Sequence, residues 1–456
     1  MVINDIPGHP KDPAGGATRV PNVNVALPSP PEAATRSTNQ ASRPQQPLTR
    51  TTVWLLVAGT FGGGMALIVP MAFTLALKLN QLAPGREETL GYILGAGSLC
   101  SLLAAPVTGI LSDRTRSRWG RRRPYTVIGA AVGLAAVPLM AFAPNILVLG
   151  LGWMLSSVGW GTAVGSIGNF QADNLAEAQR GKVSGLTGLT MQVAPVIGIM
   201  LAGTVTANAL WVFMLPAAVG TTLVAAFVIF APERDSRGRG LSTPLSVGRV
   251  LRSFGFNPRK HPAFAWVWAG RFLFFLGLSL TTSYATFFYA QRLQIGVADI
   301  TTAIAVISGA SIVSATVGAV GGGWLSDRAA HRWPFIMLGT VLYASGAVVS
   351  AFSYDLTLLL VGSFISSTGI ALFSSVGQAL ILDVLPHRET QAGRFMAITS
   401  FSQKIPSALA PLLAPVLLSI SAAGTEKNYS ALFLAAGALA VSGGLLTLLY
   451  VRAEIR

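Results

Sequence analysis

The sequence predicts an all-α membrane protein with twelve transmembrane helices in two pseudo-symmetric six-helix halves. Apolar residues make up 52% of its 456 residues and charged residues only 11%, whereas ordinary soluble domains carry about 25% charged residues. The apolar residues form long runs, and most basic residues lie in the connections between these runs. Short polar motifs also recur between the first and second halves of the chain.

The N-terminal segment, residues 1–50, is rich in Pro, Ser, Thr, Asn and Gly and contains no apolar run. Such a segment cannot bury enough apolar surface to fold, so we expect a disordered cytoplasmic tail. The first apolar run begins near Val53 and is too long for a secretory signal peptide, so we expect no cleaved leader.

Twelve apolar runs each supply the ~20 residues that a helix needs to cross the hydrocarbon core. In the N-terminal half, predicted at 51–231, the runs are 53–78, 90–111, 125–143, 146–170, 184–207 and 211–231. In the C-terminal half, predicted at 263–451, they are 263–290, 298–324, 334–353, 356–382, 396–420 and 430–451. A polar cytoplasmic linker at 232–262 separates the halves, and 452–456 forms a short cytoplasmic tail.

The basic residues predict the orientation of these helices. If the N-terminus is inside, 26 of the 32 Lys and Arg residues fall in cytoplasmic segments and four fall in outside links. Cytoplasmic connections of membrane proteins carry this kind of excess. We therefore expect a multi-pass protein of the cell membrane with both termini in the cytoplasm. The same distribution accounts for the net charge of +15, so no nucleic-acid partner is expected.

An internal repeat supports the division into halves. The motif Ser112–Arg114 recurs as Ser326–Arg328, again between a second and a third span. Asp173, at the end of the fourth span, has a counterpart in Asp383, at the end of the tenth. Parallel repeats of this kind place the substrate site of a transporter between its two halves.

The densest basic cluster extends from Gly109 to Tyr125 and reads GILSDRTRSRWGRRRPY. It resembles the loop between helices 2 and 3 of Major Facilitator Superfamily transporters. Its longer spacing is similar to that of the glycoside–pentoside–hexuronide symporters and the sucrose transporters. The resemblance implies a secondary transporter that moves a small polar organic solute, with a sugar or glycoside favoured, by alternating access.

The resemblance also implies that this stretch gates the transport cycle. We expect its carboxylate and arginines to make charge-assisted bonds across the halves while the inside is closed. The expected gating residues are Gly109, Asp113, Arg114, Gly120, Arg121, Arg122, Asp327 and Arg328, with Asp173 and Asp383 as charges at helix ends.

Ion coupling is left open by the sequence. Melibiose-type carriers have aspartates in the second span, where this chain has Ser101 and Ala105. Na⁺ needs several oxygen ligands, preferably with a carboxylate, so we expect no sodium site of that kind. None of the 17 acidic residues lies in the middle third of a span. A coupled proton stays open as a partner, and no metal or cofactor is expected.

Two cations, Arg271 and Lys404, fall within predicted spans. A cation at that depth costs at least about 2.5–3.5 kcal/mol unless it is paired or wetted. We expect Arg271 to extend inward toward Asp383 or the end of the tenth span. For Lys404, a solvated structural role and a solute contact stay open. With Gln192 and Gln403, these residues are the candidates for the substrate cavity.

Two other functions stay open. The first is export of a secondary metabolite or drug, and the second is a non-transporting membrane sensor on the same fold. No P-loop, G-x-S-x-G or H-E-x-x-H motif is present, so we expect neither an enzyme nor an ATP-driven pump. The expected partners are a small-molecule solute and the lipid bilayer, and the expected state is a monomer.

Overall fold

The computed structural model of the protein describes residues 47–233, 235–237, 256–329, 331–386, 388–419 and 427–454. Nearly all of the predicted tail at 1–50 and most of the predicted linker at 232–262 lie outside these residues. Gln46–Arg456 forms one compact unit. In the described part of the chain, twelve helical stretches are long and apolar enough to cross a membrane, which confirms the predicted fold class.

The first six spans form the N-terminal half. A π-helical turn, η1, interrupts the first span at Pro70, whose missing N–H cannot complete the α-helical hydrogen bonds. The elements are α2 (Arg50–Val69), η1 (Pro70–Thr74), α3 (Leu75–Leu82), α4 (Glu88–Arg114), α5 (Arg123–Ala141), α6 (Ile146–Asn174), α7 (Glu177–Gly203) and α8 (Ala209–Phe230).

The last six spans form the C-terminal half, and one prediction there is wrong. The seventh span is not one continuous helix, because Tyr284 leaves the helical conformation. Thr282 and Ser283 donate to carbonyls one turn earlier, a bond that bends helices. The elements are α10 (Pro262–Ser283), α11 (Ala285–Leu293), α12 (Thr301–Arg328), α13 (Trp333–Ala351), α14 (Leu356–Asp383), α15 (Arg388–Ser419) and α16 (Tyr429–Glu454).

Several helices continue past the predicted ends of their apolar runs. The α4 and α12 helices extend to Arg114 and Arg328, so Asp113 and Asp327 lie in last helical turns. Hydropathy marks only the part of a helix inside the hydrocarbon, and the helix can continue into the interfacial region. The motif carboxylates are therefore held by rigid helix ends, not by flexible connections.

Glycines bring the first and last helices of each half close together. A Cβ atom on Gly62 of α2 would lie 2.6 Å from the Gly220 carbonyl oxygen of α8. The same relation recurs in the other half, where a Cβ on Gly270 of α10 would lie 2.5 Å from the Gly443 oxygen of α16. Small residues allow this backbone approach, which is a main source of helix association in lipid.

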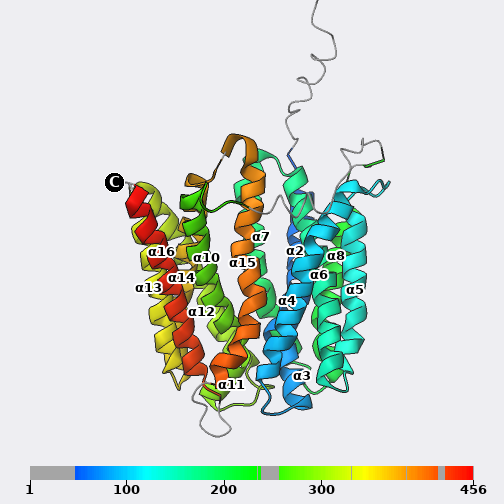
Figure 1. The fold of residues 1–456 in the computed structure, drawn as a ribbon. Coiled ribbons are helices and arrows are strands. Elements are labelled where there is room, and N and C mark those ends of the chain that lie inside the picture. The colour runs from blue at the N-terminus through cyan, green and yellow to red at the C-terminus, as the bar shows by residue number, and fades with distance from the viewer. Residues whose placement is uncertain are drawn as a thin grey trace, which may run out of the picture. The chain divides into compact units, whose positions relative to one another are not determined.

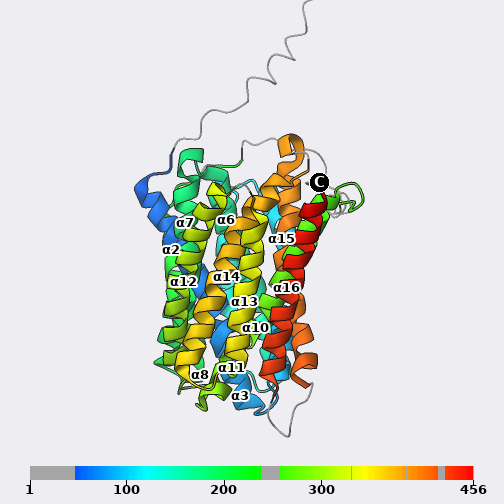
Figure 2. The same ribbon diagram turned by 90° about the vertical axis from the view of Figure 1, so that its left-hand side faces the viewer.

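The two halves stand side by side, with α4 and α15 adjacent between them (Figure 1). Figure 2 shows that α2 begins and α16 ends at the same end of the bundle, as an even number of spans requires. We call this the arginine-rich end, because Arg121, Arg122 and Arg332 lie there. The opposite end contains α3 and α11 (Figure 1).

Candidate functional site

Two arginines and two aspartates form a cluster at the arginine-rich end of the N-terminal half. Arg122 contacts Asp113 through Nη2 at 2.7 Å and Asp173 through Nε at 2.8 Å. Arg121 contacts the same two carboxylates at 3.3 and 2.7 Å. Only 7% of the Arg122 side chain is exposed. The cluster ties together the end of α4, the start of α5 and the end of α6.

The start of α5 is also held by Glu233, which sequence reasoning missed. Its carboxylate accepts backbone N–H bonds from Arg121, Arg122 and Arg123 at 2.8–2.9 Å. These N–H groups have no partner within the helix, and the helix dipole favours an anion at this position. Gly120 adopts φ +85°, and a Cβ there would collide with the Glu233 side chain. Glu233 therefore links the segment after α8 to the cluster.

The C-terminal half contains a smaller version of this cluster. Arg332 lies 2.9 Å from Asp383 and 3.8 Å from Asp327. The predicted gating residue Arg328 lies elsewhere, with its guanidinium 5.4 Å from the Trp324 ring. The repeated Asp–Arg dipeptide identified the carboxylate correctly, but the arginine that binds it is five residues downstream.

The predicted latch across the halves is not among the ion pairs that Asp113 and Asp327 make with the described residues in this conformation. The described ion pairs of Asp113 and Asp327 lie within their own halves. Gly109 has open space, since a Cβ there would meet nothing within 4 Å. Arg114 ends α4 and is exposed. A bond between the halves at this end stays a prediction for a conformation closed there.

The halves do meet at the opposite end. Tyr284, between α10 and α11, donates to the Glu88 carbonyl of α4 at 3.2 Å, and Lys427 lies 2.8 Å from the Glu88 carboxylate. Tyr429 donates to Glu87, and a Cβ on Gly91 would collide with the Pro411 carbonyl of α15. The α4 and α15 backbones are therefore in direct contact there.

The face of α15 that contacts α4 at the opposite end is exposed nearer to the arginine-rich end. Ala408 and Pro411 pack against α4 at Gly95 and Gly91. Lys404 lies four residues before Ala408 and seven before Pro411, so it shares their helix face. Lys404 and its neighbour Gln403 are exposed, and Lys404 makes no hydrogen bond or ion pair with the described residues. The two helices thus separate before they reach Lys404.

Gln192 has a position on α7 that is equivalent to that of Lys404 on α15. A Cβ on Gly203 would lie 2.7 Å from Thr301 Oγ1 of α12, so these helices also touch near the opposite end. Gln192 precedes Gly203 by eleven residues, about three turns, and lies on the same face. Gln192 is exposed, and a Cβ on Gly188, one turn further, would meet nothing within 4 Å. Gln192, Gln403 and Lys404 therefore all lie on inter-half faces that have separated.

Arg271, the fourth cavity candidate, lies elsewhere. It is 9% exposed and is packed inside the C-terminal half, with its guanidinium 4.9 Å from the Phe275 ring. The expected contact with Asp383 is not made, since Arg332 occupies that carboxylate and Arg271 forms no ion pair. The length of the apolar run and the position of Arg271 within it placed this residue in the span correctly. They could not determine which way its side chain points.

A pocket of about 190 Å³ inside the C-terminal half is lined mainly by residues that carry a hydroxyl group, together with apolar residues. Its walls come from α10, α11, α12, α13, α14 and α16, and no charged residue contributes to them. Tyr343 and Thr281 place their hydroxyls 3.1 Å apart, while the Ser311 and Ser367 hydroxyls make no hydrogen bond to the described protein. The hydroxyl-bearing residues are Thr281, Thr282, Tyr289, Ser311, Tyr343, Ser350, Ser363, Ser366 and Ser367.

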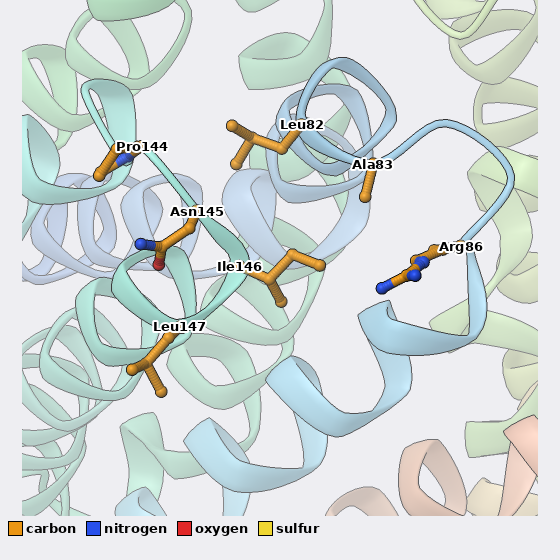
Figure 3. Close-up of a pocket in the computed structure, with 7 residues that line it drawn as sticks. All are labelled: Leu82, Ala83, Arg86, Pro144, Asn145, Ile146 and Leu147. Carbon is orange, nitrogen blue, oxygen red and sulfur yellow. The ribbon is translucent and has the colours of Figure 1, made fainter.

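A second hollow, of about 500 Å³, lies on the surface of the opposite end (Figure 3). Arg86 is its only charged lining residue, and Asn145 uses its side-chain oxygen to cap the start of α6 at Val148. All of its lining residues belong to the N-terminal half. This hollow therefore lies away from the faces that separate between the halves.

Comparison with known proteins identifies the family of this fold. The family model described as Major Facilitator Superfamily matches residues 53–320 and 298–455. The chain belongs to the Major Facilitator Superfamily. The chain is also similar in fold to the nucleoside transporter NupG, with a TM-score of 0.69, 12% identity, and coverage of 87% of this chain and 98% of NupG. A bacterial homologue of the lysosomal transporter Spinster gives a TM-score of 0.62 at 13% identity, over 91% of this chain and 96% of the homologue.

Curated relatives match only short parts of this chain. The general alpha-glucoside permease of Schizosaccharomyces pombe is 44% identical over 61 residues, 13% of this chain and 11% of the permease. The sucrose transport protein SUT1 of Oryza sativa subsp. japonica is 31% identical over 99 residues, 20% of this chain and 17% of that protein. The chain thus covers less than a fifth of these relatives.

Proposed function

We propose that the protein is a secondary transporter that moves a sugar or glycoside across the cell membrane by alternating access. The observation that carries this proposal is that the halves touch at the opposite end and separate toward the arginine-rich end. A solute could then reach Lys404, Gln403 and Gln192 from one side only. Transporters of parallel repeats bind their substrates at such an interface between repeats.

Two observations favour a sugar as the solute. The alpha-glucoside permease and the sucrose transport protein are among the relatives that match part of this chain. The hydroxyl-lined pocket offers donors and acceptors without charge, which suits a polyhydroxylated neutral molecule. An amphipathic drug would leave such hydroxyls unpaired, and an unpaired buried polar group costs about 1–3 kcal/mol. This pocket therefore favours a sugar over the exporter alternative.

We also propose that the arginine-rich end faces the cytoplasm, with both termini on that side. The basic residues of the connections support this orientation. In it, the conformation described here is open to the cytoplasm and closed to the outside. A coupled proton is compatible with this arrangement, and a monomer contains both halves of the site.

The decisive experiment is uptake into vesicles that contain the purified protein. The labelled solutes are neutral sugars, glycosides, sugar acids and amphipathic drugs, and protein-free vesicles serve as the control. Saturable uptake of a sugar or glycoside, inhibited by its unlabelled form, is expected. Transport of drugs alone would support the exporter, and no transport of any solute would favour the sensor.

A further inference from the structure

Arg271 is a buried cation without a counter-charge. Its side chain lies within the C-terminal half, and its Nε and Nη1 atoms have no hydrogen-bond partner. Its guanidinium forms no ion pair in the described part of the chain, and it lies 4.9 Å from the centre of the apolar Phe275 ring. An isolated buried cation is among the most costly groups in a protein interior, and the cost is greater within a membrane.

Among the described residues, the other two buried arginines have polar partners on the protein that Arg271 lacks, although the Arg292 Nε atom also has no hydrogen-bond partner. Arg122 lies within 2.8 Å of two aspartates. Arg292 donates through Nη2 to the Ala351 carbonyl at 2.7 Å and to Ser430 Oγ at 2.5 Å. The contrast indicates that a partner outside the polypeptide completes the Arg271 site.

A small cavity lies directly against the Arg271 guanidinium. Its volume is about 10 Å³, and its other lining residues are Val267, Ile336, Phe373, Gly377 and Thr447. That volume holds one particle about the size of a water molecule. At Gly377, a Cβ would lie 3.4 Å from Arg271 Nη1, so the missing side chain leaves room beside the donor.

The lining favours an anion over a water molecule. Thr447 donates its hydroxyl to the Gly443 carbonyl, so the guanidinium supplies the free donors of the cavity. A water molecule needs two to four polar partners, including acceptors for its own hydrogens, and this lining is mainly apolar. An anion needs only donors, and it also neutralises the charge.

We propose that Arg271 binds one small inorganic anion, such as chloride, in this cavity inside the C-terminal half. The anion is the counter-charge of a buried cation and belongs to the folded protein. It is separate from the transported solute, because Lys404, Gln403 and Gln192 lie on other helices at the inter-half faces.

Thermal unfolding of the purified full-length protein tests the proposal. Chloride is titrated against gluconate at constant cation concentration and ionic strength. We expect the unfolding midpoint to rise saturably with chloride, by about 1–2 °C at tenfold the dissociation constant. Bromide should replace chloride, and the much larger gluconate should not.

Two variants locate the anion. Arg271→Met removes the donors, and Gly377→Ala fills the cavity with a methyl group at an ordinary contact distance while keeping the charge. Both should abolish the dependence on chloride. Matched controls are Arg292→Met, another buried arginine, and Gly150→Ala, where the nearest atom to a Cβ is 3.8 Å away. Both controls should keep the full chloride-dependent shift.

Two results would overturn the proposal. One is an equal midpoint of the wild-type protein in chloride and gluconate, which would mean that only water fills the cavity. The other is a chloride shift that persists in Gly377→Ala, which would place the anion elsewhere. If Arg271→Met fails to fold, binding of radioactive chloride is compared between the wild type and Gly377→Ala. Binding by the wild type alone would support the proposal, and equal binding by both would contradict it.

Discussion

Loss of the Asp173 carboxylate should destabilise the protein more than loss of the Asp113 carboxylate. Asp173 accepts from Arg121 at 2.7 Å and from Arg122 at 2.8 Å, and 26% of its side chain is exposed. Asp113 is 55% exposed, so water and salt screen its ion pairs. Arg122 is buried, so it depends more on the less exposed carboxylate of Asp173 than on the exposed one of Asp113.

The magnitudes follow from these contacts. Hydrogen bonds to charged groups contribute about 1.5–3 kcal/mol each, and Asn keeps one acceptor in place of Asp173. We therefore expect Asp173→Asn to lower the free energy of unfolding by about 2–4 kcal/mol. Asp113→Asn should lower it by about 0–1 kcal/mol, as for other exposed ion pairs. Asp235→Asn, which breaks an exposed pair with Arg237, is the control and should cause no measurable change.

The assay is unfolding of the purified protein in mixed micelles, followed by tryptophan fluorescence. A double-mutant cycle of Asp173→Asn with Arg122→Met isolates the coupling between the two side chains. The reasoning fails if Asp113→Asn costs as much as Asp173→Asn, or if the cycle gives no coupling. Transport of Asp113→Asn should still fall several-fold, because its carboxylate is the one exposed toward a partner in a closed conformation.

Four further predictions concern the solute, the pocket, the orientation and pH. Lys404→Met should raise the half-saturation concentration about tenfold for a sugar acid, and much less for its neutral analogue; equal effects would reject charge recognition. Ser367→Ala should raise the half-saturation concentration for a neutral sugar about 3–10-fold, whereas Ser375→Ala, whose hydroxyl donates to Leu372 outside the pocket, should not. Reporter fusions after Phe230 and after Tyr354 should lie inside and outside respectively; finding both on one side would contradict the topology. Burial raises the pKa of the Glu87 carboxyl above its usual 4.5, against the opposing effects of Tyr429 and Lys427. Protonation of Glu87 thus stabilises the contact between the halves at the opposite end. This stabilisation is complete at low pH and is lost as the pH rises through the raised pKa. The alkylation rate of Leu412→Cys, divided by its rate in Leu412→Cys with Glu87→Gln at the same pH so that the titration of the thiol itself cancels, should therefore rise with pH.

The helices were predictable because membrane spans follow one rule, namely about 20 apolar residues in a row. The break at Tyr284 was not predictable in the same way, because it depends on the hydroxyls of Thr282 and Ser283 bonding back to the helix. Thr282 and Ser283 would be equally polar in an unbroken helix, so their hydropathy does not reveal the break. Hydropathy also missed the last turns that carry Asp113 and Asp327, since these extend beyond the apolar runs.

The candidate site was predictable only where charges recur near each other in the sequence. The family resemblance of the basic stretch grouped Asp113 with Arg114, Arg121 and Arg122, and the structure pairs Asp113 with Arg121 and Arg122. Glu233 lies more than 100 residues from its backbone partners, and no periodicity connects them. The hydroxyl-lined pocket was missed for a related reason. Ser and Thr are common in membrane helices, where many donate to their own backbone, so composition cannot show which hydroxyls face a pocket.

The two ends of the molecule differ in a way that suits alternating access. At the arginine-rich end, strong charge-assisted bonds hold α4, α5 and α6 together within one half, so this half can move as a rigid body. At the opposite end, the bonds between halves are few, and Lys427 and Glu88 are each about one-quarter to one-third exposed. Partly exposed pairs contribute about 1 kcal/mol or less, so breaking them is within reach of the binding energy of a small solute. The close contact at Gly91 then becomes the main barrier to opening that end, because its backbone atoms must separate and lose their packing. A bulkier residue at Gly91 should prevent closure at this end, so Gly91→Leu should trap the transporter with Leu412→Cys accessible at every pH. Unchanged protection of that cysteine would show that α4 and α15 do not form the seal.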